Sequence, residues 1–409
     1  MKKPILICIS VLLIVNTEAV SRSAEQWSSI YAAKDYDRID CILQTRDSGY
    51  IVAGVTMPLK AGSVKVWIMK IDLKGPVSWQ KTYLYSGSHS DMFSVKQTAD
   101  NGYVATALST AFGTGKTDVW ILKLRANGDE EWMKTFGGNG CDQIHSIQQT
   151  ADEGFILAGW TNKLFGAVNY DLWVLKLNKN GIMVWQKTYG GGSSEQAHSI
   201  QQTSDKGYIV AGWTYSFGLG NRDIWVLKLR ANGDVTWQKT YSGFDNDNYY
   251  FIRQINTGAY TVLSYKMSRG NHDIWILHLK QNGDIDRQKT YSGNYNAQTA
   301  HAHSIQQTSD GGYIIAGEAY SNGSNDRNIW ILKLKQDGDV DWEKIYAGNR
   351  ESYAELIQQT SDGGYIVVGW TRSFGDEKEI LAGWTRSLGD EKDIWVLKLD
   401  YNGELLPAE

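Results

Sequence analysis

Apolar and polar positions along the chain repeat with a period of about 50 residues. Within residues 199–241, four β-rich runs alternate with turn signals, at 199–203, 208–214, 223–230 and 235–241. A fixed period of this length is typical of a stacked array, and four strands per repeat predict the blades of a β-propeller. The Trp of the third run recurs at spacings of 53, 53, 52, 50, 55 and 65 residues, as Trp67, Trp120, Trp173, Trp225, Trp275, Trp330 and Trp395.

Two kinds of turn recur in phase with this pattern. Between the third and fourth strands of a repeat stand Asn-Gly or Asp-Gly pairs, which tolerate positive φ and suit tight hairpins. Between the first and second strands the pattern Thr-x-Asp-x-Gly recurs, in which we expect the Asp to bond turn amides and the Gly to relax a strained φ. This second turn begins at Thr45, Thr98, Thr150, Thr203, Thr308 and Thr360.

The repeats predict an all-β fold, a seven-bladed β-propeller with four antiparallel strands per blade. The last repeat reaches Asn402-Gly403 and ends without the Trp of a fourth strand. Trp27 lies 17 residues before Gln44, just as Trp132 lies 17 residues before Gln149. We therefore expect the N-terminal strand to complete blade seven and close the ring, which would leave no sheet edge exposed between the first and last blades.

The composition favours one continuous domain. The chain has 17 Trp, 42 Gly and only 4 Pro, and no Pro-rich or polar stretch divides it. Residues 1–19 carry two lysines, an apolar run over 5–15 and a small residue at Ala19, which predicts a secretory signal peptide and a propeller over 20–409. The protein would then be secreted, periplasmic or cell-surface, with no membrane span after signal cleavage. We expect a monomer.

The net charge bears on the class of partner, and the cysteine positions bear on disulfide formation. The formal net charge of −4 gives no reason to expect a nucleic-acid or anionic-membrane partner. Cys41 and Cys141 occupy different repeat positions two repeats apart, so a disulfide between them stays open.

A 14-residue tandem copy explains the longest spacing. The segment 369–382, GWTRSFGDEKEILA, is followed by 383–396, GWTRSLGDEKDIWV, and without one copy the last spacing falls to 51. The insertion is either a neutral surface duplication or a recruited binding loop.

The pattern SIQQT…DGGYIVAGWT…DIWVLKL…NGDVxWQKTY resembles the propeller repeat of a family of secreted or surface-attached bacterial and archaeal proteins, most of them without an assigned activity. The resemblance covers Trp27 to about Gly403. The Thr-x-Asp-x-Gly turns are also similar to the Asp-box hairpin of sialidases and sortilin-like propellers, which is structural in those families. The arginine triad and the Tyr/Glu nucleophile pair of sialidases have no matching motif in this chain.

Positions that vary in type around the ring are candidates for function, because invariant ones are explained by the fold. Near the start of the first strand, where the mouth of the axial channel is expected, the repeats place Asp40, Phe93, His145, His198, Tyr250, His303 and Glu355. Three residues before the rim residue of their repeat, Asp142, Glu195 and Asp247 add negative charge, which could hold Ca²⁺, although no metal-ligand motif is present and we expect no cofactor. This rim is either a polar ligand pocket or a set of strand-capping side chains.

A second ring lies at the ends of the second strands, where Trp160, Trp213 and Trp370 could stack on sugars or anchor a protein, or could pack between blades. The fifth repeat departs most from the pattern. It has Asn256-Thr257-Gly258 at the first turn and Arg287 where the fourth strand otherwise carries Trp, which is most simply repeat decay.

Two functions remain open. The leading hypothesis is an extracellular binding or scaffold protein that recognises a protein or carbohydrate at the channel-mouth face, because no catalytic constellation rises above the repeat background. The alternative is a carbohydrate-active hydrolase or lyase with its site at the channel mouth, in which a His and a carboxylate serve as acid and base. Convergence of such a pair within a few ångströms would favour the enzyme.

Overall fold

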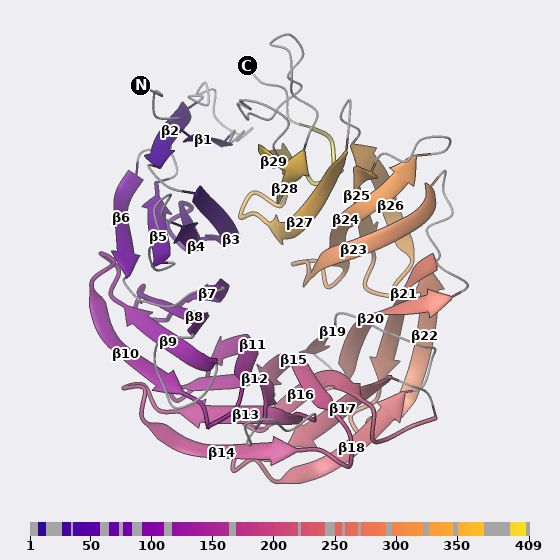
Figure 1. The fold of residues 1–409 in the computed structure, drawn as a ribbon. Helices are drawn as coiled ribbons and strands as arrows, with labels where there is room; N and C mark the ends of the chain where they lie inside the picture. The colour runs from indigo at the N-terminus through magenta and orange to yellow at the C-terminus, as the bar shows by residue number, and fades with distance from the viewer. Residues whose placement is uncertain are drawn as a thin grey trace.

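Sheets arranged radially in a ring make up the protein, as the computed structural model shows (Figure 1). The structure describes residues 7–13, 27–33, 36–57, 65–72, 77–83, 92–109, 117–162, 169–219, 222–241, 250–255, 258–268, 271–291, 297–321, 327–346, 351–371 and 393–405. Every regular element among them is a strand.

Six antiparallel sheets have four strands each, and we number them blades one to six. Blades one and two comprise β3 Tyr36–Gln44, β4 Tyr50–Met57, β5 Lys65–Ile71, β6 Val77–Tyr83, β7 Met92–Gln97, β8 Tyr103–Ser109, β9 Asp118–Leu124 and β10 Glu130–Phe136. Blades three and four comprise β11 Asp142–Gln149, β12 Phe155–Thr161, β13 Asp171–Leu177, β14 Met183–Tyr189, β15 Glu195–Gln202, β16 Tyr208–Thr214, β17 Asp223–Leu229 and β18 Val235–Tyr241. Blades five and six comprise β19 Tyr250–Gln254, β20 Tyr260–Ser268, β21 Asn271–Leu279, β22 Ile285–Tyr291, β23 Ala297–Gln307, β24 Tyr313–Ser321, β25 Arg327–Leu334 and β26 Val340–Tyr346.

The prediction of seven four-stranded blades is wrong. The seventh repeat forms a sheet of three strands, β27 Ser352–Gln359, β28 Tyr365–Thr371 and β29 Asp393–Leu399. The strand expected to complete it, β2 (Trp27–Ala33), pairs along its whole length with β1 (Ile7–Leu13) instead. The apolar strand β1 offers β2 seven consecutive antiparallel partners, whereas the described chain after Gly403 adds only one bridge, from Leu405 to Leu399.

The first strand of each repeat lies nearest the centre of the ring and the fourth lies outermost (Figure 1). Third strands such as β9 and β17 are buried along their whole length, because neighbouring sheets cover both faces. Each hydrophobic cluster joins two adjacent sheets, and the third-strand indoles of Trp120 and Trp225 are among the largest fully buried side chains. These rings are therefore part of the core between the sheets.

Side-chain amides join the first strands around the ring. In blades three and four the Gln148 side-chain oxygen accepts a hydrogen bond from the Gln202 backbone N at 2.7 Å. The same relay connects the seventh sheet to blade one, because the Gln44 backbone N donates to Gln358 Oε1 at 2.9 Å and the Ser361 backbone N donates to Gln44 Oε1 at 3.0 Å. Apolar packing of Tyr50 and Trp67 against Ile366 and Val368 accompanies it.

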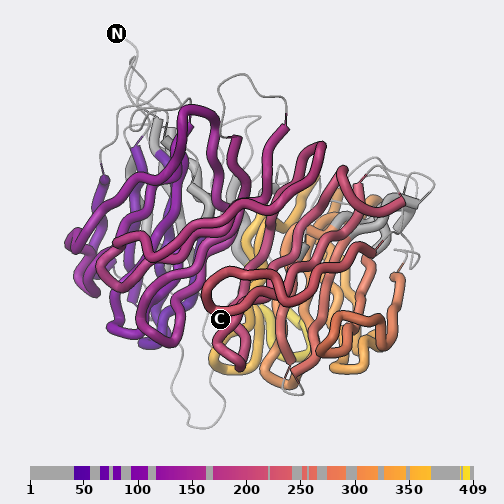
Figure 2. The backbone as a smooth tube through the Cα atoms, turned by 90° about the horizontal axis from the view of Figure 1, so that it is seen from below, coloured from indigo at the N-terminus to yellow at the C-terminus, as the bar shows by residue number. Residues whose placement is uncertain are grey.

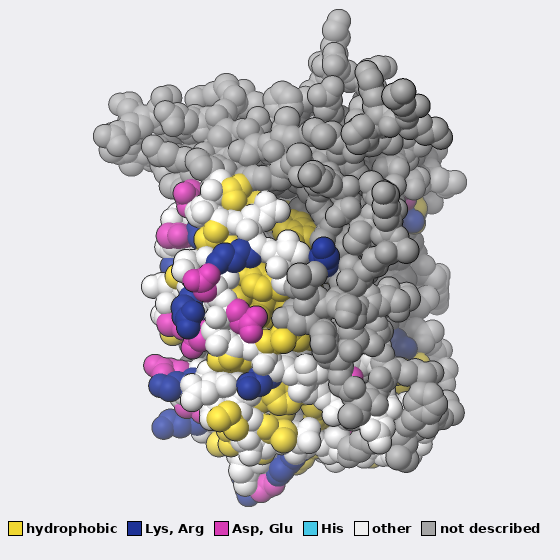
Figure 3. Space-filling view, turned by 60° about the vertical axis from the view of Figure 1, so that its left-hand side comes forward, with side chains coloured by type: hydrophobic (Ala, Val, Ile, Leu, Met, Phe, Trp, Pro, Cys, Tyr) yellow, Lys and Arg dark blue, Asp and Glu magenta, His cyan; other side chains and the backbone are white. Residues whose placement is uncertain are grey.

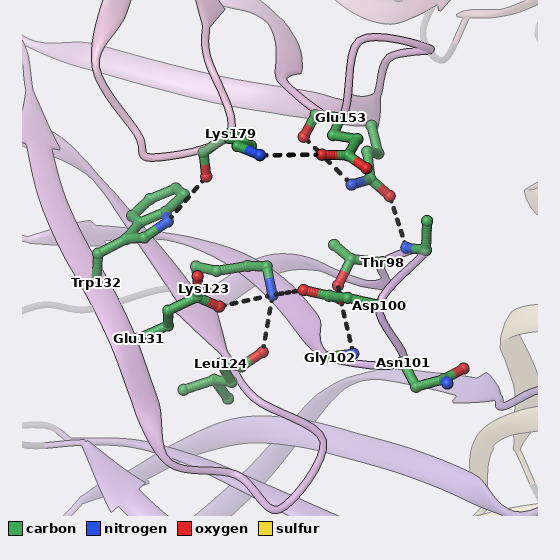
Figure 4. Close-up of polar contacts among 12 residues, drawn as sticks. Thr98, Asp100, Asn101, Gly102, Lys123, Leu124, Glu131, Trp132, Glu153 and Lys179 are labelled. Carbon is green, nitrogen blue, oxygen red and sulfur yellow. Dashed lines mark hydrogen bonds and ion pairs between the residues drawn. The ribbon is translucent and has the colours of Figure 1, made fainter.

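The short turns lie together on one side of the ring, which we call the turn face, along the lower edge of Figure 2. In blade two, Asp100 accepts hydrogen bonds from Thr98 Oγ1 and, at 2.9 Å, from the Gly102 backbone N, as expected (Figure 4). The positive φ does not fall on the Gly: it falls on the residue before it, Asn101, at 63°. Gly is required at 102 because a Cβ there would stand 2.2 Å from the Leu124 carbonyl oxygen.

In five of the blades a nearly buried lysine completes this turn. Lys123 of β9 donates to Asp100 Oδ2 at 2.7 Å and to the Leu124 carbonyl oxygen at 3.1 Å. Partial burial alone would raise the pKa of Asp100, but the hydrogen bonds from Lys123, Thr98 and Gly102 outweigh it and hold that pKa at about 2. Equivalent pairs are Lys70 with Asp47, Lys176 with Asp152, Lys228 with Asp205 and Lys333 with Asp310.

Fourth-strand indoles connect every blade except blade five to the turn of the next sheet. The Trp132 Nε1–H donates to the Lys179 carbonyl oxygen at 3.1 Å (Figure 4). The same ring covers Gly181 and meets the Phe155 ring edge-on with centroids 5.8 Å apart. On the outer surface, acidic and basic side chains are interspersed (Figure 3), as in the ion pair of Lys81 with Asp129.

Three further points concern predicted features. Cys41 and Cys141 form no disulfide. Residues 372–392, which make up most of the 14-residue duplication over 369–396, lie outside the described residues. No helix able to cross a membrane occurs in the described part of the chain.

Candidate functional site

The side of the ring opposite the turn face, which we call the loop face, carries the connections between the fourth and first strands and between the second and third. Its described loops are most complete in blades three and four, over 137–141, 190–194 and 215–219. The predicted site residues of these two blades can therefore be examined together.

The predicted rim residues occupy one distinctive backbone feature, a β-bulge in the first strand. The pairing of β11 with β12 skips His145, and that of β15 with β16 skips His198. A bulged residue leaves the ladder and has its side chain re-aimed, so its type can vary without loss of sheet pairing. The same skip occurs at Asp40, Phe93, His303 and Glu355.

Blade five differs here as well, because Tyr250 pairs directly with Ser264. The side chains of Asp40, Phe93, Tyr250 and Trp370 lie outside the described part of the structure, as does the whole of Asp247. The bulge itself leaves no motif in the sequence other than the variability that marked these positions.

The two bulge histidines of blades three and four stack on each other. Their ring centroids are 4.8 Å apart with an interplanar angle of 22°. His145 Nδ1 lies 2.9 Å from the Ala197 carbonyl oxygen, which can only accept, so Nδ1 carries the proton. In the neutral ring, Nε2 then accepts from the Gln196 side-chain amide at 3.4 Å.

Both imidazoles are held in the neutral form. Burial lowers the pKa of His145, against a smaller opposing effect of the Ala197 hydrogen bond. Burial also lowers the pKa of His198 well below its ordinary value, and the positive charges of protonated His145 and of Arg222 lower it further. The pair therefore offers hydrogen bonding and stacking surface without charge at neutral pH.

The carboxylates predicted beside these histidines are turned into the protein. Glu195 is fully buried, and its oxygens accept from the Gly191 backbone N and from Thr214 Oγ1, both at 3.0 Å. Asp142, almost fully buried, accepts from the Gly138 backbone N at 2.7 Å and from Thr161 Oγ1. Burial raises the pKa of Asp142, although these hydrogen bonds oppose it. Both carboxylates hold a loop against the end of a second strand.

An aromatic cluster lies at the same end of these blades. The Trp160 Nε1–H donates to Gln143 Oε1 at 2.9 Å, and its ring lies 4.8 Å from that of Tyr170. The Tyr170 ring in turn meets Trp213 edge-on at 5.8 Å. Trp213 is buried, whereas Trp160 and Tyr170 are half-buried.

Two residues of the loop after β16 complete the cluster. Arg222 lies over the Trp213 ring, 4.6 Å from its centroid, and donates to the Tyr215 hydroxyl at 3.1 Å. Tyr215 is 40% exposed, the most exposed ring of the cluster. We call Trp160, Tyr170, Trp213, Tyr215 and Arg222 the aromatic cluster. Sequence reasoning missed Tyr170, Tyr215 and Arg222, because it compared strand-end positions and not the loops between the second and third strands. A signal was present for two of them, since Tyr320 and Arg327 of blade six have the same spacing to their third-strand Trp.

The cluster and the histidine pair are adjacent. In the strand registers Gln143 is the partner of Trp160 and Gln196 is the partner of Trp213, so each predicted Trp stands opposite a glutamine two residues before a bulge histidine. Gln196 touches His145 as well. These contacts form one surface of rings, amides and imidazoles across two blades.

Between blade six and the seventh sheet the loop face is charged instead. His303 Nδ1 lies 3.9 Å from Glu355 Oε2, so at this point a predicted rim histidine and a predicted rim carboxylate come together. Nearby on the same sheets, Arg327 forms ion pairs of 3.1 Å with both the buried Glu318 and Glu351. Within the described residues, no three His, Cys, Asp or Glu side chains lie close enough together to share a metal ion.

No protein-family model matches the sequence, and a search of curated proteins gives no match. Among solved structures, a puromycin hydrolase matches 89% of this chain and 52% of its own length, with 12% identity and a TM-score of 0.53. The β-propeller domain of the Trilobed protease from Pyrococcus furiosus matches 82% and 89%, with 8% identity and a TM-score of 0.47. The WD40 domain of Neurospora crassa Pan2 matches 88% and 89%, with 10% identity and a TM-score of 0.47.

This chain thus spans about half the length of the puromycin hydrolase. At such identities the likeness concerns the fold alone, because one fold carries many unrelated functions. The protein is a β-propeller repeat protein, and its function has to be argued from its own site.

Proposed function

We propose that this protein is a carbohydrate-binding propeller whose site is the loop face of blades three and four. The single observation that carries the proposal is the aromatic cluster and its contact with the neutral histidine pair through Gln143 and Gln196. Sugars present flat apolar faces that stack on aromatic rings, and they carry hydroxyls that pair with amides and imidazoles. The half-buried rings of Trp160 and Tyr170 and the exposed ring of Tyr215 supply the first requirement.

Pre-organisation supports this assignment. The cation–π contact of Arg222 and the Tyr215 hydrogen bond hold the rings of the cluster against one another before any ligand arrives. Rings fixed in this way lose little conformational freedom on binding, which favours affinity. The neutral imidazoles add polar contacts that do not change with charge near neutral pH.

Binding without catalysis is favoured at this surface because its titratable groups are already engaged. Both nitrogens of His145 have partners, and the carboxylates of Asp142 and Glu195 hold loops. A general acid or base needs a free proton position within reach of the substrate. Placement of this site outside the cell, through the predicted signal peptide at residues 1–19, is part of the proposal; cleavage there would remove β1 and leave β2 without that partner.

The test is a glycan array probed with the purified protein, followed by calorimetry on the best ligand. Trp160→Ala and Tyr215→Ala are expected to weaken binding at least tenfold, about 1.4 kcal/mol. Tyr401→Ala is the matched control, because Tyr401 is an exposed tyrosine in a turn of the opposite face. Equal binding by all variants would refute this site, and N-terminal sequencing of the exported protein tests the signal peptide.

The catalytic alternative has one specific observation in its favour, the 3.9 Å approach of His303 to Glu355. A hydrolase or lyase working there would release new reducing ends or unsaturated sugars from the bound glycan. That activity should vanish in His303→Ala and persist in Trp160→Ala if the pair is catalytic. If the unaltered protein binds the glycan without turnover, the catalytic alternative is excluded and only the binding function remains.

A further inference from the structure

A cavity of about 430 Å³ opens on the turn face between blades five and six. Its lining includes His278 and Arg287 of blade five and Tyr313, Lys335 and Asp337 of blade six. The cavity lies on the opposite side of the ring from the loop-face surface described above. Two of these residues, His278 and Arg287, stand where the repeat pattern is broken.

In the other blades a tryptophan occupies this place. Trp79, Trp132, Trp185, Trp237 and Trp342 each donate Nε1–H to a backbone carbonyl of the next turn, at 3.0 to 3.3 Å. Arg287 keeps that hydrogen bond, because its Nη2 donates to the Gln336 carbonyl oxygen at 3.3 Å. It does not replace the ring.

The absence of a fourth-strand indole in blade five leaves space next to Gly338. At Gly283 a Cβ would meet the Trp237 ring at 2.8 Å, whereas at Gly338 the nearest atoms are the Tyr291 hydroxyl at 3.5 Å and His278 Nε2 at 3.6 Å. Tyr313, which corresponds to the Tyr260 against which Trp237 packs, has no indole edge-on to it among the described residues. One wall of the cavity is therefore an aromatic surface.

A second change accompanies the first. His278 stands where other third strands carry the turn-binding lysine, and the turn it would face lacks the Asp, since it reads Asn256-Thr257-Gly258. The loss of both members of an ion pair in the same repeat avoids a buried uncompensated charge. Burial, followed by the positive charge of Arg287, lowers the pKa of His278 to about 4 and keeps it neutral.

The hydrogen-bond chain behind His278 fixes which nitrogen carries the proton. The Tyr313 hydroxyl donates to Thr261 Oγ1 at 2.7 Å, so the Thr261 hydroxyl can donate to His278 Nδ1 at 3.2 Å. Neutral His278 then bears its proton on Nε2, a buried atom that has no hydrogen-bond partner in the structure, and the His278 side chain is part of the cavity lining. This side chain is only 5% exposed, so the unused donor is a buried one.

We propose that this cavity, the blade-five pocket, binds a small aromatic carboxylate. The planar ring lies against Tyr313 in the place of the missing indole, and the carboxylate accepts hydrogen bonds from Arg287 and from His278 Nε2. Lys335 adds a second positive charge at the wall. Asp337 opposes these charges with a single negative one, so Arg287, Lys335 and Asp337 together leave the wall net positive. Guanidinium and imidazole donors together favour an anionic oxygen pair.

The test is isothermal titration calorimetry of the full chain with indole-3-acetate at pH 7. Saturable one-to-one binding is expected. Indole-3-acetamide, which keeps the ring and lacks the charge, and acetate, which keeps the charge and lacks the ring, should each bind at least tenfold more weakly. Equal affinity for acetate or for the amide would contradict the assigned chemistry.

Two variants locate the site. Arg287→Trp restores the residue of the other blades and should abolish binding while the protein stays folded, since it fills the cavity with the ring that the repeat already accommodates. Arg287→Met leaves the space open and removes the charge, so binding should weaken at least tenfold. If Arg287→Trp binds indole-3-acetate as the unaltered protein does, or if the unaltered protein shows no binding at millimolar ligand, the proposal is wrong.

Discussion

The turn face and the loop face of the ring use their polar groups in opposite ways. On the turn face the same contacts recur blade after blade: Thr-Asp-Gly turns, a nearly buried lysine and an indole that covers the next Gly. On the loop face the residue at the bulge of the first strand changes in type around the ring, with neutral imidazoles in blades three and four and a His–Glu pair towards the seventh sheet. Repetition identifies scaffold, and its interruption identifies where a ligand can be sought.

The largest expected effect belongs to the turn-face indoles. Trp185→Ala removes a ring that packs edge-on against Tyr208, covers Gly233 and donates to the Ala231 carbonyl oxygen. We expect it to lower the free energy of unfolding by about 3 kcal/mol, measured by urea denaturation. Arg287→Ala, at the same repeat position, should cost less than about 1 kcal/mol. Equal costs at the two positions would mean that the indole is not what joins the blades.

A smaller effect is expected from the turn carboxylates. Asp100→Asn removes the charge that faces the nearly buried Lys123, and we expect a loss of about 1 kcal/mol at pH 7, because Glu131 also reaches that lysine at 3.2 Å. The surface pair of Lys81 and Asp129 supplies the control, since Asp129→Asn should cost less.

The same variant should change the acid response of the protein. The pKa of Asp100 is about 2 in the folded chain, against an ordinary value of 3.8. The unfolded chain therefore binds the proton first as the pH falls, and the stability contributed by this carboxylate is lost between about pH 4 and about pH 2. Asp100→Asn should lack that part of the loss. If Asp100→Asn loses as much stability between about pH 4 and about pH 2 as the unaltered protein does, the role given to the pair is contradicted.

The smallest effect on stability is expected at the interrupted junction. Arg287→Trp makes blade five resemble its neighbours on the turn face and should raise the free energy of unfolding by about 1 kcal/mol, because it fills an existing cavity. Thermal unfolding of the variant beside the unaltered protein measures this. A loss of stability would mean that Arg287 and His278 support the fold rather than a ligand.

Much of this architecture could be predicted from sequence because its signals are local. The 50-residue period, the Asn-Gly hairpins and the Asp of the first turn appear where expected, with Gly128 at a φ of 78° and Asp100 bonded to Gly102. The positive φ was expected at Gly102 but lies at Asn101. Gly is needed at 102 for another reason, the close approach of the Leu124 carbonyl oxygen from a different strand, which a local pattern does not reveal.

What failed depended on contacts between distant segments. The spacing of Trp27 to Gln44 equals that of a fourth-strand tryptophan, yet β2 pairs with β1 and does not complete the seventh sheet. The residues of a strand do not by themselves determine which strand it pairs with. The spacing placed Asp142 and Glu195 beside the histidines, but it could not reveal that their oxygens face loop amides. The ring positions Trp160 and Trp213 were found from the repeat, whereas Tyr170 and Arg222 became visible only once the loops were folded beside them.

The most direct test of the account is calorimetric titration of one array-selected glycan into four proteins: the unaltered chain, Trp160→Ala, Tyr215→Ala and Tyr401→Ala. The account predicts at least tenfold weaker binding for the two loop-face variants, no change for Tyr401→Ala on the turn face, and unfolding temperatures that confirm all four are folded. Loss of binding in Tyr401→Ala, or full binding in both Trp160→Ala and Tyr215→Ala, would contradict it.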